Sequence, residues 1–158
     1  MLSALRRLLL ALGTMLLVAM VVIVSIQIVY RYALGNPLIW TEEVARLVFL
    51  WTIFLGAAYA ATREAHLRLD LYAGDRFALM RRVSRVTGAI ATLAFSGVVV
   101  YAGWRIVDLT ASRPLPGTGL SYAWFHAAAP IGSALTILGV LLVLLGARRR
   151  RGPERSDR

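Results

Sequence analysis

The first long apolar stretch of the chain is residues 8–29, with the sequence LLLALGTMLLVAMVVIVSIQIV. No residue in it is charged, and as an α-helix it would extend about 33 Å at 1.5 Å per residue. A membrane-spanning helix needs about 20 mostly apolar residues to cross a hydrocarbon layer about 30 Å thick. We therefore predict a transmembrane helix here. The run is roughly twice the length of the apolar core of a secretory signal, so we expect it to stay attached as an anchor.

Three further apolar stretches follow this one, and they predict membrane helices at about 42–62, 86–107 and 124–145. The chain has 158 residues, of which 59% are hydrophobic and 16% are charged. Such a composition is too apolar for a soluble domain, and the connections are too short to bury a separate core. We predict an all-α membrane protein: residues 1–147 form one domain of four transmembrane helices, and 148–158 form a basic, disordered cytoplasmic tail.

The distribution of arginine predicts the orientation of these helices. All 18 basic residues are arginine. Fourteen of them precede the first predicted helix, lie around the connection between the second and third, or follow the fourth. Arginine is enriched in the cytoplasmic connections of membrane proteins, so we expect both termini in the cytoplasm. Because the membrane topology accounts for the basic charge, we expect no nucleic-acid partner. Aromatic residues gather at the opposite helix ends, as an interfacial belt would: Tyr30, Tyr32, Trp40, Tyr101, Trp104, Tyr122 and Trp124.

The connection between the second and third helices, residues 63–84, combines arginines with apolar residues in two different spacings. Periodicity therefore leaves its secondary structure open. We expect an amphipathic segment on the inner membrane surface that includes His66, Arg68 and Asp70 and faces the headgroups of membrane lipids. His66 lies near two acidic residues, but their spacing matches no recognised metal motif. We expect a surface histidine and no metal site.

A polar cluster marks the start of the second helix: Trp40, Glu42, Glu43 and Arg46, with Trp51 further along. Arg46 can pair with either carboxylate, because it follows them by four and three residues. The cluster could dock another subunit, carry protons, or cap the helix end electrostatically. We favour structural pairing within or between subunits, because no acidic residue follows in mid-membrane. Trp51, about 14 Å along the helix from Glu42, lies too deep for the aromatic belt and should contact protein.

Local signals predict further features of the helices. Thr41 and Ser121 are expected to cap the second and fourth helices. Pro130 lacks the N–H that would bond the His126 carbonyl, so it should kink the fourth helix. Small residues allow close helix contacts in lipid, as at Gly56 and Ala60 in the second helix and Gly88, Thr92 and Ser96 in the third.

The polar cluster also carries a family resemblance. Residues 40–46, followed by Trp51 and by residues 63–66, resemble the core pattern of the small membrane subunit of TRAP transporters, the tripartite ATP-independent periplasmic systems. Trp124 and the Ala-Pro-Ile-Gly stretch at 129–132 are similar to the final helix of that family. One departure is the alanine-rich segment around His126. The length, the four helices and the expected cytoplasmic termini match as well.

The resemblance implies a multi-pass protein of the bacterial inner membrane that is not an enzyme and binds no cofactor. It implies two partners: a large multi-span permease subunit, which carries the substrate and ion sites, and a periplasmic substrate-binding protein, which delivers a carboxylate. Transport in such systems is driven by a cation gradient, usually sodium. The chain would then scaffold the large subunit.

Two other function classes are alternatives. An autonomous small multidrug-type exporter also has four helices, but it should carry an acidic residue inside a span, and none is predicted here. A membrane redox protein with haem would need paired axial ligands. His66 and His126 lie at opposite sides of the predicted membrane and cannot supply them.

Overall fold

The computed structural model describes residues 2–67 and 78–149. The four helices are α1 (Leu2–Ile28), α2 (Ile39–Leu67), α3 (Ala78–Thr110) and α4 (Ala123–Arg149), and α1 continues into a π-helical turn, η1 (Val29–Ala33). Helices α2 and α3 both extend into the connection expected between them. The central part of the predicted amphipathic segment, with Arg68 and Asp70, lies outside the described residues, as does the tail beyond residue 149.

All four helices are long and apolar enough to cross a membrane. The qualifying segments are Leu2–Ala33, Ile39–Arg63, Val86–Thr110 and Ala123–Leu145. Each includes the whole span predicted from hydropathy, which confirms the all-α membrane fold. The helices run past the predicted spans because backbone hydrogen bonding continues into polar sequence where hydropathy falls. The cytoplasmic location of the termini stays a prediction.

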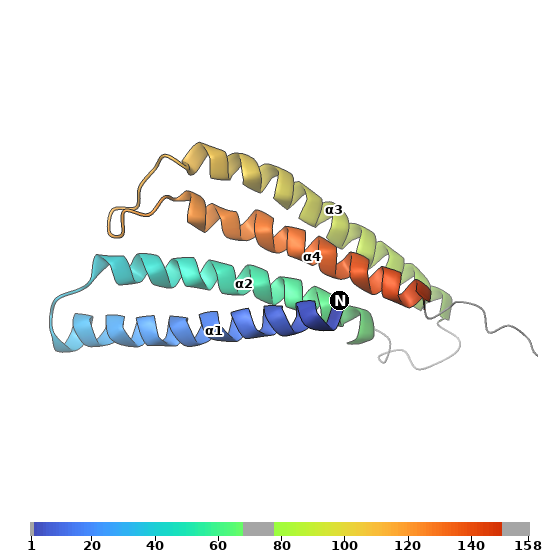
Figure 1. The fold of residues 1–158 in the computed structure, drawn as a ribbon, viewed down its shortest axis with the longest axis horizontal. Coiled ribbons are helices and arrows are strands. Elements are labelled where there is room, and N and C mark those ends of the chain that lie inside the picture. Colours follow the sequence, from blue (N-terminus) through green and yellow to red (C-terminus); the bar gives the residue numbers. More distant parts are fainter. Residues whose placement is uncertain (1, 68–77, 150–158) are drawn as a thin grey trace, which may run out of the picture.

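The helices lie side by side in the spatial order α1, α2, α4, α3 (Figure 1). Helix α4 packs extensively against both α2 and α3, whereas α1 packs mainly against α2. Consecutive helices run in opposite directions, so the α1–α2 and α3–α4 connections share one end of the molecule (Figure 1). The described helices therefore form a row, which leaves wide apolar surfaces on its two faces.

Helices α2 and α4 meet through two glycines of α4 that lie seven residues apart on one face. A Cβ atom at Gly132 would lie 2.5 Å from Cβ of Phe54 and 3.1 Å from its carbonyl oxygen. A Cβ atom at Gly139 would lie 2.9 Å from Cγ2 of Thr62, which is fully buried. In lipid, helix association depends on such close packing. These two glycines let the backbone of α4 rest on α2.

Helices α3 and α4 meet at a third close contact. A Cβ atom at Gly103 would lie 3.0 Å from Cδ of Pro130, and Pro130 lies fully buried inside α4. The kink at Pro130 stays a prediction. Gly56 makes no close contact with the other described helices, because no atom lies within 4 Å of its Cβ position, and both Gly56 and Ala60 are exposed. Their close packing against another helix stays a prediction. Ser96 on α3, in contrast, is buried.

Candidate functional site: the polar end of α2

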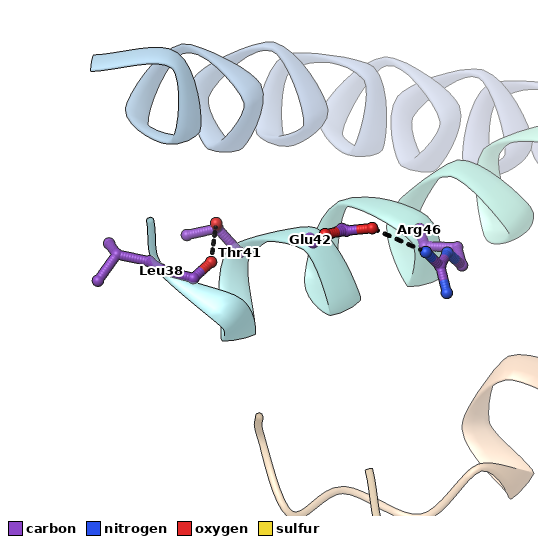
Figure 2. Close-up of polar contacts among 4 residues, drawn as sticks. All are labelled: Leu38, Thr41, Glu42 and Arg46. Carbon is purple, nitrogen blue, oxygen red and sulfur yellow. Dashed lines mark hydrogen bonds and ion pairs between the residues drawn. The ribbon is translucent and has the colours of Figure 1, made fainter. Parts of the chain in front are cut away.

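Helix α2 begins at Ile39, two residues before the threonine expected to cap it. The expectation for Thr41 is wrong, because a cap residue must precede the helix and Thr41 already belongs to its first turn. Its hydroxyl donates a hydrogen bond of 2.6 Å to the Leu38 carbonyl (Figure 2). The side chain is fully buried. Thr41 therefore anchors the start of α2 by its packing and by binding the preceding turn.

Arg46 forms an ion pair with Glu42, one helical turn away. Nη2 of Arg46 lies 3.0 Å from Oε1 of Glu42, and the two side chains are 62% and 65% exposed (Figure 2). Exposed pairs of this spacing contribute about 0.3–0.5 kcal/mol. The pair therefore adds little to folding, and it displays both charges on the surface of the protein.

Glu43 binds the connection between α3 and α4 instead. Its Oε1 accepts a hydrogen bond of 2.8 Å from the Gly117 amide. Its Oε2 accepts two bonds of 2.9 Å, from the amide and from the hydroxyl of Thr118. The two adjacent glutamates thus have different roles: Glu42 binds a residue of its own helix, and Glu43 binds residues more than seventy positions away in the chain.

The connection reaches Glu43 because it folds back toward the start of α2 (Figure 1). The amide of Leu115 donates to the Leu120 carbonyl at 2.7 Å, and Gly119, with φ of 70°, forms the turn. Gly117 needs its missing side chain, because a Cβ atom there would lie 3.0 Å from the Trp40 amide nitrogen. Residues 114–121 form a small hairpin, which is thereby held against α2.

The cap predicted at the start of α4 is present in the structure. Ser121 Oγ accepts a hydrogen bond of 3.1 Å from the amide of Ala123, the first residue of α4. The same hydroxyl donates to the Ala111 carbonyl at 2.7 Å. Ser121 therefore joins the end of α3 to the start of α4.

Trp51 joins α2 to the start of α4. Its indole Nε1 donates a hydrogen bond of 3.2 Å to the Trp124 carbonyl. The ring packs against the buried cluster of Leu9, Leu55 and Ala58 between α1 and α2. The expectation that Trp51 contacts protein is confirmed. Trp51 and Glu43 thus connect α2 to the α3–α4 half of the protein at two depths.

Of the remaining predicted site residues, Trp40 lies at this end of α2, and the others lie elsewhere or outside the described residues. Trp40 is exposed beside the hairpin, and Pro130 lies deep in α4. His66 falls in the last turn of α2, far from the polar end, and Arg68 and Asp70 lie outside the described residues. Among the side chains described, no group of three or more His, Asp and Glu residues could hold a metal ion.

Sequence reasoning missed Gly117 and Thr118, the residues that bind Glu43. The glycines and prolines of this connection disfavour regular structure, but they do not indicate which residues the connection binds. The sequence did contain a signal, because two carboxylates lie near one arginine. One of these carboxylates therefore needs hydrogen-bond donors elsewhere. Backbone amides of a turn are such donors.

Comparison with known proteins identifies the family. The family model for the tripartite ATP-independent periplasmic transporters, DctQ component, matches residues 20–150. The chain belongs to this family. The match extends from the last part of α1 through the end of α4, so α2, α3 and α4 are wholly included in the DctQ pattern.

Three relatives show how much of this chain is similar to known TRAP permease proteins. The sialic acid TRAP transporter small permease protein SiaQ of Vibrio cholerae serotype O1 is 28% identical over 77% of this chain and 70% of its own length. The ectoine TRAP transporter small permease protein TeaB of Halomonas elongata is 31% identical over 85% and 69%, respectively. The sialic acid TRAP transporter permease protein SiaT of Haemophilus influenzae is 28% identical over 76% of this chain and 20% of its own. All three are transporter permease proteins, not enzymes.

Proposed function

We propose that this chain is the small permease subunit of a TRAP-type secondary transporter and scaffolds a large multi-span permease subunit. The observation that carries the proposal is the DctQ family match over residues 20–150. The similarity to SiaT supports the large partner, because a region similar to this chain makes up one fifth of that longer permease protein.

The arrangement of the helices supports a scaffolding role. A row of helices offers two broad apolar faces, whereas a closed bundle would bury most of that surface in itself. The carboxylates whose side chains are described, Glu42, Glu43 and Asp108, all lie at the same end of the row, and Glu64 lies at the opposite end of α2. An ion pathway needs polar groups at mid-membrane depth, so we assign the substrate and ion sites to the large subunit.

We further infer a carboxylate substrate, a periplasmic binding protein that delivers it and a cation gradient that drives its uptake. The substrates named for SiaQ and TeaB, sialic acid and ectoine, both carry a carboxylate. The bacterial TRAP permease relatives support a location in the bacterial inner membrane. The arginine distribution supports cytoplasmic termini. We also retain the division into one transmembrane domain, 1–147, and a basic tail.

Reconstitution tests this function. The chain, a large TRAP permease subunit from the same organism and the binding protein are combined in proteoliposomes, and uptake of a labelled carboxylate is measured with and without a sodium gradient. We expect uptake only when both membrane polypeptides and the gradient are present. Full uptake by the large subunit alone, or purification of this chain without a large partner in several mild detergents, would contradict the subunit assignment.

The exposed pair of Glu42 and Arg46, with Trp40 beside it, is our candidate contact with the large subunit. In Arg46→Ala, thermal stability should change by no more than about 0.5 kcal/mol, because the pair is exposed. Recovery of the large subunit in pull-down should fall several-fold. Arg105→Ala, which removes an exposed arginine from the same end of α3, is the matched control. Normal complex yield and uptake in Arg46→Ala would remove this pair as a contact.

A further inference from the structure

Arg6 and Arg63 lie at the end of the α1–α2 pair that is opposite the hairpin. Arg6 lies near the start of α1, and its Nη2 donates a hydrogen bond to the Thr62 carbonyl on α2. Arg63 is the next residue of α2, and its guanidinium carbon lies 5.4 Å from the centre of the Tyr59 ring. The bond from Arg6 to α2 thus places this cation beside Arg63, at the end of the α2 span opposite the hairpin.

Neither cation has a carboxylate partner among the described side chains. The ion pair that the described side chains form is Glu42–Arg46, and it lies at the other end of the protein. Nε of Arg6 is shielded from solvent and has no hydrogen-bond partner in the part of the chain that the structure describes. A guanidinium offers five N–H donors in a planar fork that matches the oxygens of a phosphate. The two arginines therefore have donors and positive charge available for an oxyanion.

The surface beside Arg6 is apolar and suits a lipid chain. Leu10, Leu17 and Val21 follow Arg6 on the same side of α1, at helical spacing, and are 52%, 54% and 58% exposed. A ligand that fits both parts has an anionic headgroup and a long hydrocarbon tail. We propose that Arg6 and Arg63 bind the phosphate of an anionic phospholipid whose acyl chain lies along this side of α1.

Lipid titration of the full chain, followed by native mass spectrometry in nonionic detergent, tests the site. The measured quantity is the dissociation constant of the first phosphatidylglycerol bound. Arg6→Gln and Arg63→Gln should each weaken it about tenfold, because each removes charge-assisted bonds to phosphate. The matched control is Arg7→Gln, which removes the same charge from the same turn of α1. Arg7 is exposed and makes no hydrogen bond or ion pair with the described residues, so its loss should change the constant less than about twofold.

Two more probes separate the possible sources of the phosphate. Zwitterionic phosphatidylcholine should bind the unaltered chain at least about tenfold more weakly than phosphatidylglycerol. Inorganic phosphate, at the same concentration as the lipid, should not displace bound phosphatidylglycerol. Displacement would mean that the site takes a free anion and would overturn the lipid assignment.

A conservative variant keeps the test decisive if Arg6→Gln does not fold. Arg6→Lys retains the charge but loses the planar fork, so it should bind phosphatidylglycerol several-fold more weakly than the unaltered chain. Equal weakening in Arg6→Gln and Arg7→Gln would show diffuse attraction and overturn the site. Unchanged affinity for phosphatidylglycerol in both Arg63→Gln and Arg6→Lys would also overturn the site.

Discussion

Replacing Gly132 with alanine is expected to destabilise the chain by about 1–3 kcal/mol, the usual cost of overpacking a tight contact. The new methyl would lie 2.5 Å from Cβ of Phe54, with the Phe54 backbone 3.1 Å away, so α4 would have to move off α2. Because α4 joins α2 to α3, this displacement loosens the centre of the row. Thermal unfolding in mild detergent, followed by circular dichroism, measures the effect.

Gly56→Ala is the matched control for this prediction. Gly56 lies in the middle of α2, and no atom lies within 4 Å of its Cβ position. Alanine is the better helix former, so the unfolding midpoint should stay the same or rise slightly. Equal losses in the two variants would show that glycine matters at both positions for its backbone alone, which would contradict the role assigned to the Gly132 contact.

The four helices could be predicted from the sequence, but their order in space could not. The apolar stretch at 8–29 is long enough to specify a membrane helix whatever its neighbours are. Contacts between helices depend on which face turns inward, and a helix that is apolar on all sides gives no such signal. Gly56 and Gly132 look alike in the sequence. The structure packs Gly132 against Phe54 and leaves Gly56 open.

The candidate site, too, could be predicted from the sequence only in part. The spacing of Glu42, Glu43 and Arg46 predicted an ion pair, and the structure forms it with Glu42. Helical spacing made both carboxylates acceptable partners, so it could not choose between them. The choice follows from the fold of the hairpin, which presents the amides of Gly117 and Thr118 to Glu43. That contact joins segments distant in the chain, and a local pattern does not encode it.

The Glu43 contact also has a mechanical consequence for the proposed subunit. Helix α1 packs mainly against α2, and α3 packs against α4. Close packing at Gly132 and Gly139 joins these two pairs within the membrane, and Glu43 joins them at the end that carries the hairpin. The hairpin is therefore fixed relative to α2 and not only to the helices that flank it. A large subunit or a binding protein would meet a preformed surface at this end.

Glu43→Gln is expected to release the hairpin while the four helices remain folded. A glutamine retains one acceptor oxygen but replaces the other with an NH₂ donor, which would face either the Gly117 amide or the two donors of Thr118. At least one donor is then left without its acceptor. Hydrogen exchange at the amides of Gly117 and Thr118 should become faster by about tenfold or more, since local opening sets the rate. Exchange in the middle of α2 and α4 should stay unchanged.

Glu42→Gln provides the control, because it makes the same change in charge at the preceding residue. It removes the exposed pair with Arg46 but leaves the three bonds from Gly117 and Thr118 to Glu43 intact. Exchange at these two amides should therefore stay within about twofold of the unaltered chain, since surface pairs contribute little. If both variants accelerated exchange equally, loss of negative charge near the hairpin would explain the effect, and the specific contact with Glu43 would not. Unchanged exchange in Glu43→Gln would mean that the hairpin keeps its shape through its own backbone bonds, with Gly119 in the left-handed region as their main support.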